Sequence, residues 1–300
     1  MSKVTTMREA VAALVHDGDT VVLEGFTHLI PYAAGHEIIR QRRRDLTLCR
    51  LTPDVIADQL IAAGCVSRLV FSWAGNPGVG SLHAFRRAVE ATPPTLALDE
   101  YSHFGMVARL SAGAARLPFW PLSDYQGTDL PAANPNIRSV TCPFTGRVLA
   151  AVPALNPDVT IVHVQRADAD GNAQVWGLLG VQKEAAFAAR RVLVVAEELV
   201  DPAVIRADPN RTIIPGLAVD AVVVEPWGAH PSYAQGFYDR DNAFFVAWED
   251  ISRDAARLQA YLDTWVHGVA DRAEYLARQP QLAARLRAGR MMSGEVNYGF

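Results

Sequence analysis

The sequence is poor in cysteine and has no cysteine pattern. Its three cysteines, Cys49, Cys65 and Cys142, form neither a CxxC pair nor a cluster with histidine. This spacing argues against a zinc site and against a disulfide framework. Cys142 precedes a proline and could act as a nucleophile. With no base close to it in sequence, an inert thiol is the stronger interpretation.

The chain also lacks a large excess of charge and a long apolar run. The formal net charge is -4 and the sequence pI is about 6.1, so nucleic acid is not expected as a partner. No apolar stretch is long enough to cross a bilayer, and the first residues, Met1 to Glu9, are polar with no signal core. We therefore expect a cytoplasmic protein with no membrane partner.

What the sequence does contain is a large hydrophobic fraction, arranged in short runs. Half of the 300 residues are hydrophobic, which is enough for a large core. Short apolar runs alternate with helical patterns, which is typical of an α/β fold with an open, mainly parallel sheet flanked by helices. The predicted strands are 21–23, 45–49, 69–71, 96–98, 159–164, 192–196 and 221–224, and the predicted helices are 7–16, 31–44, 54–63, 106–117 and 181–189.

Two later segments break this alternation. Residues 118–157 are rich in Pro, Gly, Asn and Asp, and we expect an irregular crossover or a partner-facing loop there. From Asn242 onward, apolar residues recur at helical spacing, which predicts a helical C-terminal cover with a frayed end at 289–300. The predicted division is an α/β domain over 1–241 and a helical cover over 242–300.

The chain is organised around residues 17–40, which read as turn, strand, loop and helix. Asp17-Gly18 is typical of a turn, Val21 to Leu23 of a buried strand, and Pro31 of a first helical turn. The loop from Glu24 to Ile30 then lies at the carboxyl end of a strand and leads into a helix. Ligands bind at such places in open α/β sheets, because free N–H groups and the helix dipole favour negative charge.

Polar side chains follow the next three predicted strands as well. Arg50 and Thr52 follow the second strand, a glycine-rich loop follows the third, and the pair Ser102-His103 follows the fourth. Arg50 would suit a substrate carboxylate, with a surface salt bridge as the alternative. Ser102 or His103 could bind an acyl group, or His103 could be structural. The basic run Arg42 to Arg44 could meet a phosphate, but a solvated helix end explains it more simply.

The sequences of two loops disfavour common types of nucleotide and metal site. The loop 72–81 has no Gly-Lys-Ser/Thr end and no GxGxxG order, which disfavours a nucleoside triphosphate or a dinucleotide. Asp168 and Asp170 lie in a string similar to a calcium loop, but the later ligands are out of register, so a hairpin turn is predicted. No metal site is expected.

Several of these stretches together resemble the A (α) subunits of class I coenzyme A transferases. Glu24-Gly25-Phe26-Thr27 is similar to the Gly-Gly-Phe signature of that family, and residues 72–81 are similar to its glycine-rich loop. The strings 228–232 (GAHPS) and 238–242 (YDRDN) match it further, and the resemblance runs from Met7 to about Trp265. These strings are similar to those of the glutaconate and 3-oxoadipate types of the family.

The resemblance implies a function and a partner. It implies the A (α) chain of an enzyme that moves CoA from a donor such as succinyl-CoA to a dicarboxylate such as 3-oxoadipate. The nucleophilic glutamate would lie on a separate B (β) subunit, in an α2β2 or larger assembly, with CoA thioesters as substrates and no permanent cofactor. The residues it implies in substrate or CoA binding are Gly25, Phe26, Thr27, His28, Arg50, Thr52, Ser72, Gly75, Asn76, Gly78, Ser102, His103 and His230.

Two departures from the family pattern keep other functions open. The asparagine that often ends the second strand is absent, so backbone N–H groups and Thr52 would have to replace it, or the chemistry differs. Glu24 replaces a glycine, and a free carboxylate would repel anionic ligands. We expect Glu24 to be neutralised by His28, Arg50 or backbone N–H groups and to orient the loop. A CoA-thioester hydrolase, lyase or decarboxylase, or a non-catalytic acyl-CoA-binding scaffold, remains an alternative.

Overall fold

The computed structural model describes residues 2–123 and 125–288, so the predicted frayed end at 289–300 lies outside the described residues. The strands are β1 (Thr20–Glu24), β2 (Leu46–Cys49), β3 (Val66–Phe71), β4 (Ala97–Glu100), β5 (Phe119–Leu122), β6 (Arg138–Thr141), β7 (Val148–Pro153), β8 (Val159–Ala167), β9 (Ala173–Gln174), β10 (Arg191–Leu199), β11 (Thr212–Ile214) and β12 (Ala221–Val224). The α-helices are α1 (Met7–Leu14), α2 (Tyr32–Arg40), α3 (Val55–Ala62), α4 (His83–Glu90), α5 (His103–Ala114), α6 (Leu130–Ala133), α7 (Gln182–Ala188), α8 (Pro202–Ala207), α9 (Asn242–Arg253), α10 (Ala255–Leu262), α11 (Arg272–Ala277) and α12 (Leu282–Arg285).

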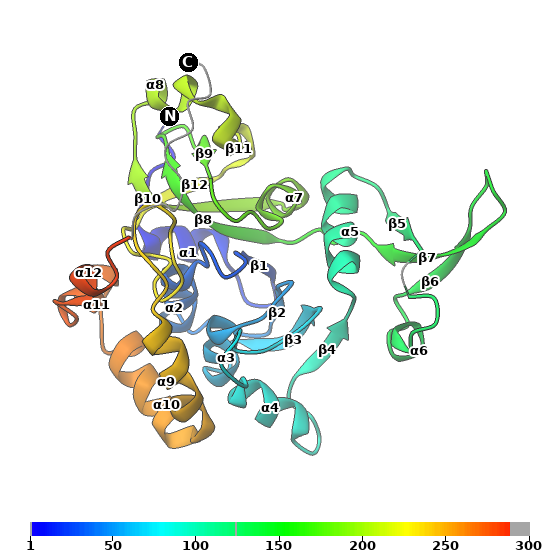
Figure 1. The fold of residues 1–300 in the computed structure, drawn as a ribbon, viewed down its shortest axis with the longest axis horizontal. Helices are drawn as coiled ribbons and strands as arrows, with labels where there is room; N and C mark the ends of the chain where they lie inside the picture. The colour runs from blue at the N-terminus through cyan, green and yellow to red at the C-terminus, as the bar shows by residue number, and fades with distance from the viewer. Residues whose placement is uncertain (1, 124, 289–300) are drawn as a thin grey trace.

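A nine-stranded, mainly parallel sheet forms the centre of the molecule (Figure 1). Its parallel strands run in the order β12-β10-β8-β1-β2-β3-β4, and β1 lies between β8 and β2. Strands β9 and β11 extend the sheet in antiparallel pairing beyond the end of β8. The predicted fold class is confirmed, and so is the hairpin between β8 and β9.

The central parallel strands β1, β8 and β10 are buried on both faces, which explains their continuous apolar runs, whereas the edge strand β4 is largely exposed. In β1, Val21 and Leu23 pack into the core under α1, α2 and α3, whereas Val22 packs into the core under α5 and α7. The same alternation in β3 sends Leu69 and Phe71 to the first core and Val70 to the second. The period of two along each strand therefore separates two helical layers.

The C-terminal helices α9 and α10 cover the outside of the α1–α4 layer, as Figure 1 shows in orange. Phe245, Trp248 and Leu258 belong to the same core as β1 and β3. The Trp248 indole also donates to Asp58 of α3 at 3.0 Å. The predicted helical cover therefore shares a core with the sheet. The domain division at residue 241 stays a prediction.

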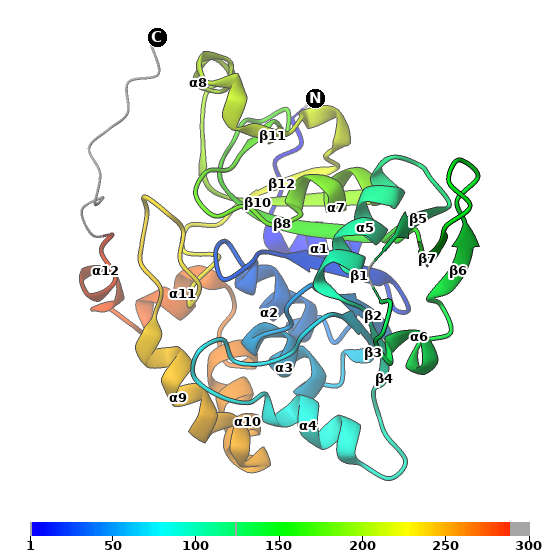
Figure 2. The same ribbon diagram turned by 45° about the vertical axis from the view of Figure 1, so that its right-hand side comes forward.

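The segment 118–157 is not irregular, and this prediction was wrong. It contains a three-stranded antiparallel sheet in the order β5-β7-β6, with the short helix α6, and it projects from the body as an arm (Figures 1 and 2). Its strands are short and interrupted by turn residues such as Gly127 and Gly146, so their period was hidden in the sequence. At the tip of the arm, the Phe144 side chain is 92% exposed.

Smaller differences affect element ends. Helix α5 begins at His103 instead of Met106, because Ser102 caps it by accepting a hydrogen bond from the Gly105 N–H at 2.9 Å. Helix α2 ends at Arg40 and does not include the basic residues 42–44. Within the described residues, none of the helices has both the length and the apolar character needed to cross a bilayer.

Candidate functional site

The candidate site lies at the carboxyl edge of the sheet, where β1, β2, β3 and β4 end side by side. Parallel strands bring all their carboxyl ends to one edge, so loops far apart in sequence meet there. The loop after β1 (25–31), the residues after β2 and β3, and the start of α5 come together at this edge. A fifth segment, residues 177–181 before α7, joins them.

The loop after β1 is folded tightly. A side-chain carbon on Gly25 would lie 2.6 Å from the Leu29 carbonyl oxygen, so only glycine fits. Thr27 and Leu29 have positive φ angles of 57° and 54°, which non-glycine residues rarely adopt. The Ser232 hydroxyl donates to the Thr27 carbonyl at 2.7 Å and helps to hold this strained loop.

Arg50 holds the same loop in place through hydrogen bonds to its backbone. Its guanidinium donates to the carbonyls of Leu23 and Gly25 and to the Asp54 carboxylate, which lies 3.0 Å away. The residue is only 2% exposed. The predicted contact between Arg50 and a substrate carboxylate is therefore revised, because its donors face the backbone of β1 and Asp54. Arg50 instead fixes the place where β1 turns into the loop.

The segment 177–181 covers the side chain of Glu24. Its carboxylate accepts the Val181 N–H at 3.3 Å, and a side-chain carbon on Gly180 would lie 2.6 Å from Glu24 Oε1. Burial raises the pKa of Glu24, while the charge of Arg50 and the N–H groups of Val181 and Gly25 oppose that rise. Of the three neutralising groups that we expected, Arg50 and backbone N–H groups are present.

His28 does not supply a positive charge. Its Nδ1 donates to the Leu178 carbonyl at 2.9 Å, and its Nε2 accepts the Gln235 N–H at 3.0 Å. Burial lowers the pKa of His28 to about 4, so the ring is neutral near pH 7. The expectation that His28 is a cation for Glu24 or for a substrate carboxylate is corrected. The ring instead ties the β1 loop to the segment 177–181.

Ser72, His103 and Phe26 form the accessible centre of the site. The Ser72 hydroxyl donates to the Leu51 carbonyl at 2.5 Å and lies 2.9 Å from His103 Nδ1. Because that hydroxyl has one hydrogen, His103 Nδ1 is the donor to Ser72, and His103 Nε2 is left as an acceptor. The Phe26 ring meets the His103 ring edge-on, with centroids 5.8 Å apart. Three strand ends thus contribute to one cluster.

The N-terminus of α5 faces the same edge. This helix has 12 residues, and its positive end lies beside His103. The Ser102 N–H donates to the Tyr125 hydroxyl at 3.0 Å, which links the helix start to the arm. A negative charge that develops near His103 would therefore be favoured by the helix dipole.

Gly75 and Asn76 of the glycine-rich loop have structural roles that the sequence did not predict. Gly75 packs under the Trp73 ring, where a side-chain carbon would lie 2.5 Å from it. Asn76 is buried and donates to the Phe245 carbonyl of α9 at 2.6 Å, so the predicted substrate contact through its side chain is corrected. Gly78, with a φ of 79°, is exposed, and Thr52 is half-buried beside the site.

His230 is also a structural residue. Its ring lies 3.1 Å from Asp241 and 3.0 Å from the Tyr275 hydroxyl, and it is fully buried. Burial lowers the pKa of His230 to about 4. The predicted ligand contact of His230 is therefore corrected, because the string 228–232 packs against α11 and turns the chain toward α9.

Apolar side chains surround the accessible centre. Trp73 and Phe104 are 49% and 52% exposed, and they directly follow Ser72 and His103. Leu178 and Leu179 are also exposed, on the segment that covers Glu24. Exposed large apolar residues around one polar centre are typical of a surface that another protein covers. We refer to Trp73, Phe104, Leu178 and Leu179 as the apolar rim.

Sequence reasoning missed the segment 177–181 altogether. It lies more than 150 residues from Glu24 in the chain and meets it only because β8 pairs with β1. A signal was present, since Gly177 and Gly180 bracket two leucines between a strand and a helix. Gly177 takes a φ of 91°, and Gly180 makes room for Glu24.

The remaining candidates in the described part of the chain are metal ligands and reactive thiols. Residues 2–123 and 125–288 contain no group of three or more His, Cys, Asp or Glu side chains that could hold a metal ion. Burial raises the pKa of Cys49 to about 12 and that of Cys65 to about 11. Cys142 follows β6 on the arm, and hydrogen bonds with Thr145 and the Phe144 backbone lower the pKa of its thiol.

The sequence profile of the coenzyme A transferase family matches residues 4–225. The chain belongs to the coenzyme A transferase family. It is 53% identical over 279 residues to the A chain of the 3-oxoadipate CoA-transferase of Pseudomonas knackmussii, with 93% of this chain and 98% of the relative covered. The glutaconate coenzyme A-transferase structure from Acidaminococcus fermentans matches with a TM-score of 0.89 at 35% identity, covering 95% of this chain and 94% of that one.

A third relative has a different activity in its name. The structure of a variant of the decarboxylase AibA/AibB matches with a TM-score of 0.73 and 32% identity, covering 88% of this chain and all (100%) of that one. The family comparisons agree with the resemblance found in the sequence. The chain is the A-type chain of a CoA transferase, and relatives named in this way imply a second, B-type chain as partner.

Proposed function

We propose that this chain and a B subunit transfer CoA from an acyl-CoA donor such as succinyl-CoA to 3-oxoadipate. The identity of 53% over nearly the whole length of both chains carries this proposal. The transfer would pass through a CoA thioester on a glutamate of the B subunit. In this division of work, the present chain supplies the wall of the site and the B subunit supplies the nucleophile.

The side chains at the site support a binding and polarising role. The Ser72 hydroxyl donates its hydrogen to the Leu51 carbonyl, so it is not activated by His103. Glu24 is buried under residues 177–181 and has no open path to a thioester. The N-terminus of α5 remains, and its dipole would favour the negative charge that develops on the reacting thioester, whereas His103 Nε2 would accept a hydrogen bond from the substrate.

Glu24 is proposed as a positioning residue. Through the Val181 N–H it holds the segment 177–181 against the β1 loop, and Arg50 holds that loop from the other side. Glu24→Gln keeps the shape and removes the charge. We expect it to slow turnover and alter the affinity for the acid, while the thioester still forms on the B subunit. A trapped label on Glu24 itself would overturn this assignment.

The proposal is tested by trapping the intermediate. The purified two-subunit complex is incubated with succinyl-CoA and then with borohydride, and the reduced residue is located by mass spectrometry. We expect loss of activity, modification of one glutamate of the B subunit, and ping-pong kinetics with 3-oxoadipate as acceptor. Sequential kinetics with no trapped residue would contradict the proposal.

Decarboxylation is the second candidate. The match to the AibA/AibB decarboxylase and the absence of an asparagine at the end of β2 favour it. Release of CO2 from a carboxylated acyl-CoA, without any acceptor acid, would identify this activity. Under the first proposal, CoA moves only when an acceptor acid is present.

A further inference from the structure

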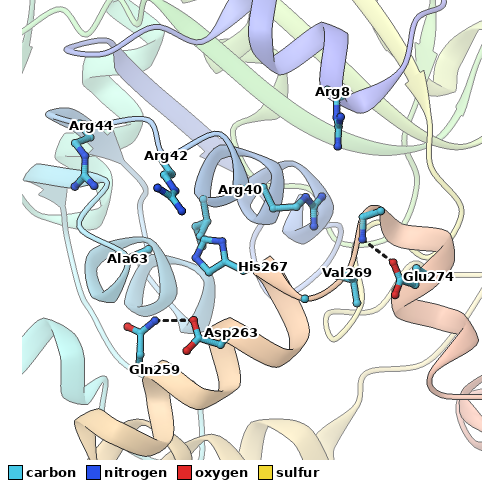
Figure 3. A pocket seen from close by; sticks show the side chains of 13 residues that line it. Arg8, Arg40, Arg42, Arg44, Ala63, Gln259, Asp263, His267, Val269 and Glu274 are labelled. Atoms are coloured by element: carbon cyan, nitrogen blue, oxygen red, sulfur yellow. Dashed lines mark hydrogen bonds between the residues drawn. The ribbon is translucent and has the colours of Figure 1, made fainter.

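A basic pocket of about 830 Å³ lies on the other side of the molecule from His103. Figure 3 shows arginine side chains from α1 and from the end of α2 on one wall, and residues of α10, the turn after it and α11 on the other. The arginines that line it are Arg8, Arg40, Arg42 and Arg44.

The pocket is separate from the candidate site. Arg40 ends α2 and Ala63 follows α3, and both lie where the chain is about to enter β2 or β3. These positions mark the amino edge of the sheet, whereas Ser72 and His103 lie at the carboxyl edge. Strands of four to six residues, at about 3.3 Å per residue, separate the two edges. An occupant of the pocket therefore does not contact the reacting groups.

The arginines of the pocket are poorly neutralised. Within residues 2–123 and 125–288, the side chains of Arg8 and Arg42 make no hydrogen bond or ion pair. The Arg44 guanidinium donates only to the Gly64 carbonyl, at 3.4 Å. Arg40 is paired with Glu37 at 2.8 Å. An excess of cations gathered in one concave surface is typical of an anion site.

The opposite wall carries two acidic residues. Glu274 accepts from the Ala270 N–H and is paired with Arg278 at 2.6 Å, whereas Asp263 accepts from the uncharged Gln259 amide at 2.9 Å. The four arginines of the lining still outnumber its two carboxylates. These oxygens face the same pocket and could also accept from hydroxyl or amino groups. The pocket thus has a basic wall and a wall whose oxygens suit uncharged polar donors.

Arg42 also takes a conformation that favours glycine. Its φ is 55°, and it follows α2 in a turn in which its N–H bonds to Ile39 and the Arg43 N–H bonds to Ile38. Glycine is the usual residue there, because a side chain is strained in the left-handed region. Arg116 holds the same place after α5, with a φ of 57°, but does not line this pocket. It offers a matched control.

We propose that this pocket binds a multiply phosphorylated anion of nucleotide size, such as pyrophosphate or a nucleoside diphosphate. A guanidinium group can donate two parallel hydrogen bonds to phosphate oxygens. Several arginines spread along one wall therefore suit two linked phosphates better than one. The volume lies in the range of small-molecule sites, which is about 300–1,000 Å³.

Calorimetric titration of the two-subunit complex tests the proposal. Inorganic pyrophosphate, ADP and adenosine are titrated at constant ionic strength into the wild-type complex and into Arg42→Gly and Arg116→Gly complexes. We expect pyrophosphate and ADP to bind, and Arg42→Gly to weaken them by at least about fivefold. Arg116→Gly should leave both affinities unchanged. Both substitutions place glycine where the backbone favours it, so folding should be kept.

Arg8→Gln, on the exposed face of α1, gives an independent reduction in affinity for the same ligands. Pyrophosphate as tight as ADP means that phosphates alone are recognised, and tighter ADP means that the acidic wall adds contacts to the nucleoside. Both results support the site. Equal affinity of the wild-type and Arg42→Gly complexes, adenosine binding as tight as ADP, or no binding heat for either phosphate would overturn it.

Discussion

At the scale of single residues, the polar side chains of this chain fall into two groups that the sequence does not separate. Ser72 and His103 are accessible and are joined by a hydrogen bond. His28 and His230 are buried, and both are held by hydrogen bonds on two sides. Neutral buried histidines make stability depend on pH, whereas an accessible histidine can contact a substrate.

We expect Ser72→Ala to lower the transfer rate by about tenfold, because His103 loses the partner that orients its ring. The readout is kcat and KM for the complex, measured separately. Ser67→Ala, at the opposite, exposed end of β3, is the matched control and should behave as wild type. A Ser72→Ala enzyme with an unchanged rate would remove His103 from the mechanism.

For His28 the effect is on folding. Its pKa is about 4 in the folded chain and about 6.5 as the ordinary value, so between these pH values the unfolded chain binds a proton that the folded chain does not. Stability from this residue is present above pH 6.5 and is lost as the pH falls toward 4. Between pH 7 and pH 5 the loss should be about 2 kcal/mol.

His28→Gln should therefore reduce the pH dependence of the unfolding free energy over this range, measured by urea denaturation at pH 7 and pH 5. The variant should be less stable than wild type at pH 7, because glutamine does not reproduce both ring bonds, and the difference should shrink at pH 5. The same pH dependence in both proteins would show that His28 is not the titrating group.

At the scale of elements, the site depends on a contact between the end of β1 and the segment 177–181. Two glycines and a neutral histidine allow that segment to lie directly on Glu24 and Phe26. The contact is close enough that one added carbon should disturb it.

Gly180→Ala should cost about 1–3 kcal/mol of stability and should reduce turnover, because the new carbon would lie 2.6 Å from Glu24 Oε1. The double variant Glu24→Ala/Gly180→Ala removes the opposing oxygen. Its unfolding free energy should be less reduced than the sum of the two single changes predicts. Additive costs would mean that Gly180 is constrained by something other than Glu24.

At the scale of the whole molecule, exposed apolar side chains gather at one edge of the sheet. The apolar rim surrounds His103, and the arm extends from the same side of the helical layer that contains α5 (Figure 2). We expect the rim to be buried against the B subunit, since exposed aromatic residues are enriched at the centres of interfaces.

The variants Trp73→Ser and Phe104→Ser should each weaken association with the partner about tenfold or more, with no loss of secondary structure. Leu217→Ser is the control, because Leu217 is exposed in the turn before β12, away from the rim. Association is measured by analytical ultracentrifugation of the mixed subunits. Unchanged association of both rim variants would place the interface elsewhere.

The isolated chain should have no CoA transferase activity, because its accessible side chains bind and polarise but include no activated nucleophile. Activity is assayed for the purified chain on its own and after addition of its partner. Full activity without the partner would contradict the two-chain mechanism.

The sequence alone determined the fold class and the family, and it predicts a site at the strand ends. These follow from local patterns. Runs such as Val21 to Leu23 are typical of strands buried on both faces, and parallel strands bring the loops at Glu24, Ser72 and His103 to one edge. The helix after Ser102 was predicted three residues late, because a cap depends on one hydrogen bond rather than on apolar spacing.

Only the tertiary structure decided which polar residues stay accessible at the edge of the sheet and which face the protein. Arg50, His28, Asn76 and His230 have the same chemical groups as binding residues, but each finds its partners in segments distant in the chain. The segment 177–181 meets Glu24 only through the pairing of β8 with β1. Burial and long-range hydrogen bonding determine these roles, and neither produces a periodic pattern in the sequence.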